Sequence, residues 1–141
     1  MGKLIYLLDT NILSEPAKAR PNTDVMERLE CYEGCFCTAA TVWHELRFGC
    51  EKLPPSKSRH HLESYLRMLL DNALVILPFD QKAAEWLAGE RARLMRQGYV
   101  PAYADSEIAA IAVTNQLVLV TRNSRDFERF DNFRLENWFE H

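Results

Sequence analysis

The sequence predicts an α/β protein of three layers, in which a mostly parallel central sheet of four to five strands is flanked by helices. Short apolar segments alternate along the chain with longer segments whose apolar residues recur every three or four positions, and this alternation favours parallel strands joined by right-handed crossovers. The chain has 141 residues, about the length of one domain. We therefore expect a single domain over residues 1–141.

Four short segments rich in aliphatic or β-branched residues are typical of strands that are covered on both faces, and such strands are usually parallel. A fifth segment near the end of the chain is a candidate edge strand. In chain order the segments are Leu4–Leu8, Cys35–Ala39, Leu74–Leu77, Leu117–Val120 and the candidate Arg134–Trp138.

Five segments are expected to form helices, because several of them repeat apolar residues at helical spacing. The dipeptide Pro54-Pro55 separates two of them and indicates a loop within the domain rather than a boundary between domains. The expected helices are Asp24–Tyr32, Thr41–Gly49, Ser56–Asn72, Gln81–Gln97 and Ser106–Asn115.

The total charge gives no sign of a nucleic-acid partner, because 17 basic and 20 acidic residues leave a net charge of −3. The middle segment, residues 51–100, is the exception and carries more basic than acidic side chains. The longest apolar runs, Leu4–Leu8 and Leu117–Val120, fall far short of the roughly 20 residues that cross a bilayer. We expect no membrane span.

The start of the sequence has no apolar segment long enough for a signal peptide, so the protein is expected in the cytoplasm. In that reducing compartment the four cysteines should be thiols. Their spacing lacks the paired C-x2-C units of a structural zinc site, and small buried side chains are the simpler interpretation. The cysteines are Cys31, Cys35, Cys37 and Cys50.

In parallel α/β sheets, ligands bind beyond the carboxyl ends of the strands. Asp9 follows the first predicted strand and Asp126 follows the fourth, while Glu45 and Asp105 lie near the starts of two predicted helices. Each acid alone has a structural interpretation, as a helix cap, a turn residue or an exposed helix residue. Brought together, four carboxylates would repel one another unless a cation such as Mg²⁺ or Mn²⁺ lay among them.

The strings around these acids resemble the four motifs of the PIN-domain family, and most of all the VapC-type toxins of bacterial toxin–antitoxin pairs. The resemblance extends over nearly the whole chain, from Leu4 to Phe127. The strings are Leu8–Glu15, Thr41–Leu46, Gly98–Ala112 and Leu119–Phe127. Family members are mostly Mg²⁺- or Mn²⁺-dependent ribonucleases, so the resemblance implies a metal-dependent endoribonuclease that hydrolyses RNA phosphodiester bonds with a metal-activated water.

Carried over by position, the resemblance assigns catalytic and metal-binding roles to all four acids. Asp9 and Asp105 would bind the first ion directly, whereas Glu45 and Asp126 would act through water or through a second ion. One departure is Glu107, where many relatives have an uncharged polar residue. We expect it to interact with the helix dipole as a first-turn acid and not to bind metal.

Polar neighbours are expected to fix the carboxylates by hydrogen bonds, and nearby basic side chains are candidates for contact with the RNA backbone. The supporting residues would be Thr10, Asn11, Thr121 and Asn123, and the possible backbone contacts Arg122, Arg125 and Lys52. A solvated helix face is the alternative explanation for such basic residues.

The resemblance also implies partners: an RNA substrate, a small cognate antitoxin protein and a second copy of the chain in a homodimer. Two other functions are open at this point. A phosphatase would use Asp9 as a covalent nucleophile, but it commonly has a second aspartate two residues later, where this chain has Asn11. A catalytically silent PIN-like module that only binds protein or RNA would be expected to lack one of the main acids, and all are present.

Overall fold

The computed structural model describes residues 3–140 and contains one sheet of five strands in the order β3-β2-β1-β4-β5. Every pairing between neighbouring strands is parallel. The strands are β1 (Tyr6–Leu8), β2 (Phe36–Ala39), β3 (Ile76–Leu77), β4 (Val118–Val120) and β5 (Leu135–Glu136). The predicted parallel sheet is therefore confirmed, including the last edge strand.

The helices lie between the strands in chain order, as the alternating pattern predicts. They are α1 (Thr10–Leu13), α2 (Thr23–Cys31), α3 (Ala40–Glu51), α4 (Lys57–Asp71), α5 (Gln81–Arg96) and α6 (Tyr103–Thr114), with two 3₁₀ turns, η1 (Glu15–Ala17) and η2 (Ser124–Asp126). Four of the helices begin at a side-chain cap, in which Asp9, Asn22, Ser56 or Asp80 accepts a backbone N–H from the first turn.

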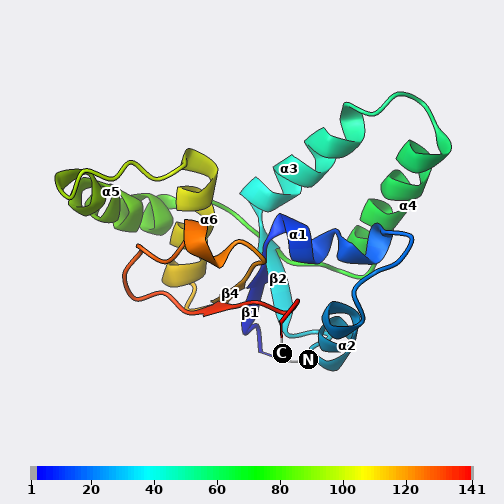
Figure 1. Ribbon diagram of the computed structural model, residues 1–141, viewed down its shortest axis with the longest axis horizontal. Coiled ribbons are helices and arrows are strands. Elements are labelled where there is room, and N and C mark those ends of the chain that lie inside the picture. Colours follow the sequence, from blue (N-terminus) through cyan, green and yellow to red (C-terminus); the bar gives the residue numbers. More distant parts are fainter. Residues whose placement is uncertain (1–2, 141) are drawn as a thin grey trace.

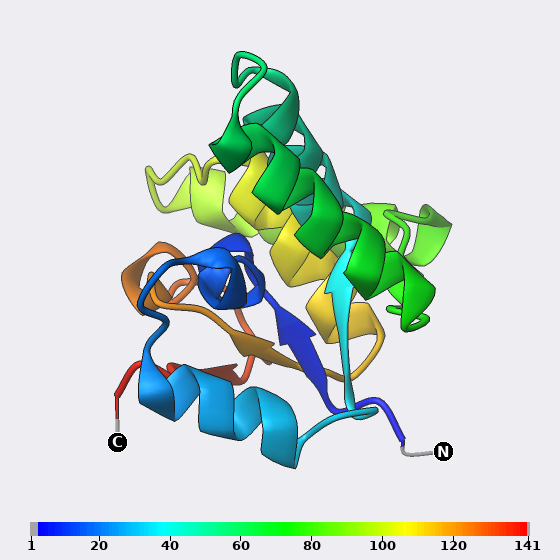
Figure 2. The ribbon, with the colours of Figure 1, turned by 90° about the vertical axis from the view of Figure 1, so that its right-hand side faces the viewer.

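The sheet forms the middle layer, with α5 and α6 on one side and α2 and α4 on the other (Figure 1). The view turned by 90° shows α2 running across one end of the strands, and the α3–α4 hairpin at the opposite end (Figure 2). Leu7 and Leu8 of the central strand are fully buried, which explains their uninterrupted apolar sequence. Trp138 is also fully buried and packs on Tyr6 and Tyr32.

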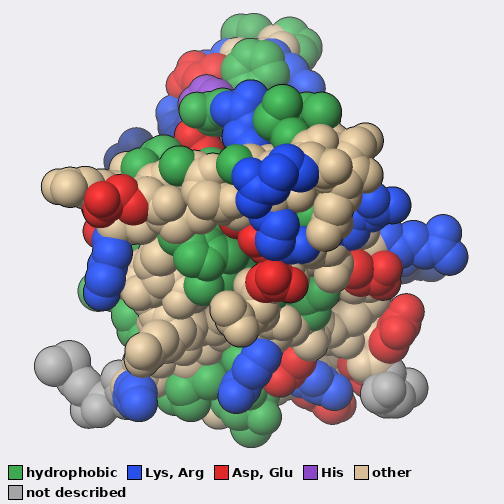
Figure 3. Space-filling view, turned by 90° about the vertical axis from the view of Figure 1, so that its left-hand side faces the viewer, with side chains coloured by type: hydrophobic (Ala, Val, Ile, Leu, Met, Phe, Trp, Pro, Cys, Tyr) green, Lys and Arg blue, Asp and Glu red, His purple; other side chains and the backbone are tan. Residues whose placement is uncertain are grey.

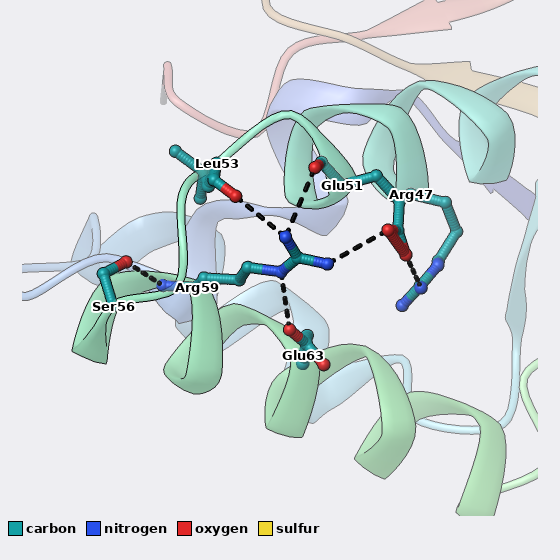
Figure 4. Close-up of polar contacts among 6 residues, drawn as sticks. All are labelled: Arg47, Glu51, Leu53, Ser56, Arg59 and Glu63. Atoms are coloured by element: carbon teal, nitrogen blue, oxygen red, sulfur yellow. Dashed lines mark hydrogen bonds and ion pairs between the residues drawn. The ribbon is translucent and has the colours of Figure 1, made fainter.

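The α3–α4 hairpin is held together by Arg59 of α4 (Figure 4). Its guanidinium binds Glu63 Oε1 at 2.9 Å and Glu51 Oε2 at 3.1 Å, and donates to the Leu53 carbonyl at 2.9 Å. These contacts join the last turn of α3, the connecting loop and the first turns of α4. They therefore fix the start of α4 against the end of α3.

Two parts of the helical structure differ from the sequence prediction. The short α1 and η1 turns follow β1 at once and were not expected. Helix α6 begins at Tyr103 rather than Ser106, after an Ala102 that provides no side-chain cap. Because a capping side chain is the usual local signal of a helix start, its absence explains why the sequence suggested a later one.

None of the helices formed by residues 3–140 combines the length and the apolar character that crossing a bilayer requires. All four cysteines are free. Cys37 and Cys50 are buried, whereas Cys31 is exposed and Cys35 is partly covered.

Candidate functional site

Asp9 lies directly beyond the carboxyl end of β1, beside the end of its neighbour β4. Its carboxylate caps α1 by accepting the Thr10 backbone N–H at 2.8 Å, and its second oxygen accepts the Thr121 hydroxyl at 2.7 Å. Only 7% of its surface is exposed. Both oxygens are thus held in place, one by a residue that follows β1 and the other by a residue that follows β4.

Glu45 reaches this region from the second turn of α3. The Thr10 hydroxyl donates to its Oε1 at 3.3 Å, so Thr10 touches two of the predicted acids, one through its N–H and one through its hydroxyl. Burial and the nearby Asp9 carboxylate raise the pKa of Glu45 above its ordinary value, against the opposing effect of the Thr10 hydrogen bond.

Asp105 lies in the first turn of α6 and is half-buried. Burial, followed by the negative charges of Asp126, Asp9 and Glu45, raises the pKa of Asp105 from 3.8 to about 6. The pKa of Asp9 is raised as well, first by burial and then by Asp126, although its hydrogen bonds act in the opposite direction.

Asp126 completes the group from the exposed η2 turn that follows β4. The structure therefore brings the four sequence-predicted acids into one electrostatically coupled group, although they come from four separate segments. Among residues 3–140, none of the ion pairs formed with Lys or Arg involves any of these four side chains. Their mutual repulsion is therefore not offset by an ion pair with Lys or Arg within these residues.

The donor atoms fit a hard divalent cation, because all of them are carboxylate oxygens. No three His, Cys, Asp or Glu side chains of the described residues converge closely enough to hold a metal ion among themselves. A site closed by protein ligands alone is therefore not formed. Mg²⁺ does not need one, since it commonly takes one or two carboxylates and completes its shell with waters and substrate phosphates.

The residues expected to fix the acids fall into two groups. Thr10 and Thr121 contact the carboxylates directly. The hydrogen bonds of Asn11 and Asn123 go to neighbouring residues instead. The Asn11 side chain accepts the Arg122 backbone N–H at 3.0 Å, and the Asn123 N–H donates to Thr121 Oγ1 at 3.0 Å. The two asparagines thereby shape the β4–η2 turn rather than the carboxylates themselves.

The three basic candidates are placed differently. The Arg122 guanidinium stacks over the Phe139 ring at 4.3 Å, which fixes it beside the turn that carries Asp126. Lys52 lies at the far end of α3 over the Phe48 ring, at 5.3 Å. Arg125 is an exposed residue of η2.

Sequence reasoning missed Glu15, a buried acid of η1. Burial raises its pKa, but the ion pair with Lys18 at 2.9 Å, the Asn22 N–H at 2.7 Å and the charge of Arg122 outweigh that effect and lower it. Glu15 is thus linked electrostatically to Arg122. Its only sequence signal was its position at the end of the string that begins with Leu8 and Asp9.

The expectation for Glu107 was wrong in one respect. Because α6 begins at Tyr103, Glu107 lies beyond the first turn and is not a first-turn acid. Its carboxylate instead accepts the Thr41 hydroxyl of α3 at 2.9 Å. Glu107 therefore joins α6 to α3, the two helices that carry Asp105 and Glu45.

Comparison with known proteins gives one family and several full-length relatives. The PIN domain family model matches residues 6–132. Ribonuclease VapC2 of Haemophilus influenzae (strain ATCC 51907 / DSM 11121 / KW20 / Rd) is 35% identical over 136 residues, covering 96% of this chain and 98% of that protein. The tRNA(fMet)-specific endonuclease VapC of Shigella flexneri is 33% identical over the same length and coverage.

Solved structures match over nearly the whole chain as well. A structure of FitAB bound to the IR36 DNA fragment aligns with a TM-score of 0.87 at 31% identity and covers 97% of both chains. A toxin–antitoxin complex from Klebsiella pneumoniae aligns with a TM-score of 0.70 at 27% identity, covering 96% of this chain and 99% of that one. The fold and its connectivity are thus shared with these proteins.

Proposed function

The chain belongs to the PIN domain family and has VapC ribonucleases as full-length relatives, and we propose that it is an endoribonuclease toxin that hydrolyses RNA with Mg²⁺ or Mn²⁺ held by Asp9 and Asp105. The observation that carries the metal assignment is the group of four carboxylates, in which the pKa values of Asp9, Glu45 and Asp105 are raised and, among the described residues, none of the four forms an ion pair with Lys or Arg. Such a group is stable in its ionised form only when a cation compensates it.

A divalent ion bound here would supply an activated water and polarise the phosphoryl oxygen of the substrate. Asp9, held by Thr10 and Thr121, would bind the ion through its remaining lone pairs. Glu45 is more exposed and would orient the attacking water by a hydrogen bond. Asp126 would support a second, weaker ion near the leaving oxygen.

Arg122 is the basic residue best placed to bind a substrate phosphate. Its guanidinium is held by the Phe139 ring and its backbone by Asn11, so little side-chain freedom remains to be lost on binding. Arginine also presents paired donors that match phosphate oxygens. Replacing Arg122 by Gln should raise KM for RNA and reduce the salt dependence of binding.

The cleavage test uses chelator-treated protein and a structured RNA. Cleavage should appear only when Mg²⁺ or Mn²⁺ is restored, and Asp9→Asn or Asp105→Asn should abolish it. Glu107→Gln is the matched control, because Glu107 follows Asp105 by two residues but is bonded to Thr41, and this variant should keep most of the activity. Full activity in either aspartate variant would overturn the proposed function.

We also propose an RNA substrate, a cognate antitoxin and a homodimer as partners. Solved structures similar to this chain are toxin–antitoxin complexes, which supports an antitoxin partner. Expression of this chain alone should arrest growth, and co-expression of the small protein encoded beside it should relieve the arrest. Asp9→Asn should remove the arrest without any antitoxin. Absence of growth arrest in the wild type would contradict the toxin role.

Neither alternative function is supported. The two relatives named above are a ribonuclease and an endonuclease, and all four acids are present. Asn11 binds the Arg122 backbone N–H in the place where a phosphatase would have its second aspartate.

A further inference from the structure

Exposed aromatic residues occur at only two positions in this chain. The sequence has 7 Phe, 5 Tyr and 3 Trp, all within the described residues, and 13 of these 15 are buried or partly covered. The exceptions are Phe48, 57% exposed, and Tyr103, 63% exposed. Phe48 lies on α3 with Glu45, and Tyr103 lies on α6 with Asp105. Each exposed ring therefore shares a helix with an acid of the candidate site.

The two rings lie on helix faces that are joined about one helical turn from Glu45. On α3, Thr41, Glu45 and Phe48 follow one another at spacings of four and three residues and so share one face. On α6, Tyr103 and Glu107 are four residues apart and share a face. The hydrogen bond from Thr41 to Glu107 joins these two faces. From that contact the helices separate, α3 toward the hairpin and α6 toward its N-terminus (Figure 1).

A basic side chain stands over each exposed ring. Lys52 Nζ lies 5.3 Å from the centre of the Phe48 ring, and the Arg91 guanidinium of α5 lies 6.0 Å from the centre of the Tyr103 ring. The His44 ring adds a further flat surface, stacked on Phe48 at 6.4 Å with an interplanar angle of 28°. Each position thus combines an aromatic face with a positive charge.

Aromatic faces beside positive charges are the surfaces on which proteins bind unpaired nucleotides, because bases stack on the rings while phosphates contact the cations. We propose that Phe48 with Lys52, and Tyr103 with Arg91, are two subsites for unpaired nucleotides on either side of the RNA bond cleaved at the acidic group. The proposal rests on the proposed function and assigns these four side chains to substrate binding.

Lys52 beside the Phe48 ring favours RNA over a protein partner, because the core of a protein interface is depleted in lysine. On the α5 side of the molecule, basic side chains lie among acidic and hydrophobic ones rather than around one continuous apolar area (Figure 3). A second copy of the chain covering these rings is the competing explanation, and the test below separates the two.

The first experiment measures equilibrium binding of a fluorescently labelled single-stranded RNA in chelator, where cleavage does not occur. Phe48→Leu and Tyr103→Leu keep an apolar side chain but lose the ring, and each should weaken binding by about 5- to 100-fold. Phe48→Tyr and Tyr103→Phe should restore it. Leu70→Ala, at an exposed position of α4 that is 50% accessible, is the matched control and should bind as the wild type does.

The second experiment keeps the wild-type protein and removes single bases from the RNA around the mapped binding site. Removal of the base that stacks on Phe48 should weaken RNA binding by the wild type but cause no further weakening in Phe48→Leu. Removal of a base at a different nucleotide should give the same pattern for the wild type and Tyr103→Leu. Because the substrate is altered here, this result does not depend on a variant that folds well.

Two results would overturn the subsites. The first is unchanged RNA binding in both leucine variants. The second is a leucine variant that loses RNA binding and also has a lower molar mass in solution than the wild type, which would assign the rings to an interface between chains. The proposed function fails separately, if the wild type binds RNA through these rings but does not cleave it when Mg²⁺ or Mn²⁺ is added.

Discussion

At the scale of single residues, the position of Asp9 depends on one hydroxyl. Thr121 is fully buried, donates to Asp9 Oδ2 and at the same time accepts the Asn123 N–H. A buried carboxylate that loses such a donor keeps its desolvation cost without compensation. Thr121 therefore links the orientation of the Asp9 carboxylate to the shape of the turn that carries Asp126.

Replacing Thr121 by Val keeps the volume of the side chain and removes the hydroxyl. We expect the affinity for Mn²⁺ to fall about 10- to 100-fold and the free energy of unfolding to fall by about 1–3 kcal/mol. Calorimetric titration and denaturant unfolding measure the two effects. Thr121→Ser retains the hydroxyl and should stay close to the wild type, whereas unchanged Mn²⁺ affinity in the valine variant would show that Thr121 has no part in the site.

Asp105 makes the metal-free protein sensitive to pH. Its pKa rises from 3.8 in the unfolded chain to about 6 in the folded one, so the folded state binds the proton more tightly. Between these two values the unfolded chain carries fewer protons, and the free energy of unfolding therefore falls as pH rises. Above pH 6 the ionised Asp105 is a net cost to the metal-free fold.

We therefore expect Asp105→Asn to stabilise the metal-free protein at pH 7.5 by about 1–2 kcal/mol, after allowance for solvent screening at this half-buried group. The gain should shrink as pH falls toward 4. Denaturant unfolding in chelator at a series of pH values measures it, with Asp71→Asn, at an exposed position of α4, as the control. A constant gain across this range would show that Asp105 does not titrate as described.

At the scale of elements, the parts predicted from sequence were those with a strong local pattern. The apolar segments before Asp9 and after Gln116 form β1 and β4, because two-sided burial leaves a continuous apolar sequence. The start of α6 could not be predicted from the sequence, because Ala102 has no side chain that can cap the helix. The turn α1 was also missed, because four residues are too few for a helical repeat and their conformation depends on Asp9 as cap.

A buried carboxylate also connects α5 to the segment that follows η2. Glu90, 7% exposed, forms two hydrogen bonds with Arg93 at 2.7 and 2.9 Å and accepts the backbone N–H of Asp131. Arg93 in turn donates to the Arg129 carbonyl at 2.8 Å. This cluster fastens the chain just beyond Asp126 to the helical layer, and nothing in the local sequence distinguished Glu90 from an exposed helix residue.

Glu90→Gln should lower the free energy of unfolding by about 1–3 kcal/mol, because Arg93 then loses the buried one of its two carboxylate partners and keeps only the exposed Asp131. The Arg93 hydrogen bonds lower the pKa of Glu90, so the stabilisation that it provides should be present at neutral pH and disappear as pH falls below about 4.5. Denaturant unfolding at pH 7 and pH 3.5 measures both effects. Glu85→Gln, at an exposed position of the same helix, should have little effect at either pH.

At the scale of the whole molecule, the strand order explains why the acids meet. The chain builds the sheet outward from β1 through β2 to β3, then returns to the other side of β1 with β4. Such a reversal leaves a ligand-binding crevice at the carboxyl ends of the two strands where the order reverses, β1 and β4. The sequence indicated which residues follow each strand. It could not indicate which strands are neighbours, nor that Phe48 and Tyr103 are left exposed, because both depend on tertiary packing.

If the acidic group at this crevice binds divalent ions, as we propose, the stability of the whole fold should depend on these ions. A ligand that binds only the folded state stabilises it by about 2.7 kcal/mol at a concentration of 100 Kd. Mn²⁺ should therefore raise the thermal unfolding midpoint of the wild type. The ionic strength is kept constant, so that general screening of the −3 net charge does not change between samples. Asp9→Asn and Asp105→Asn should lose most of this rise, whereas Glu107→Gln should keep it, since its carboxylate binds Thr41. An equal rise in all four proteins would mean that the ion binds elsewhere on the chain.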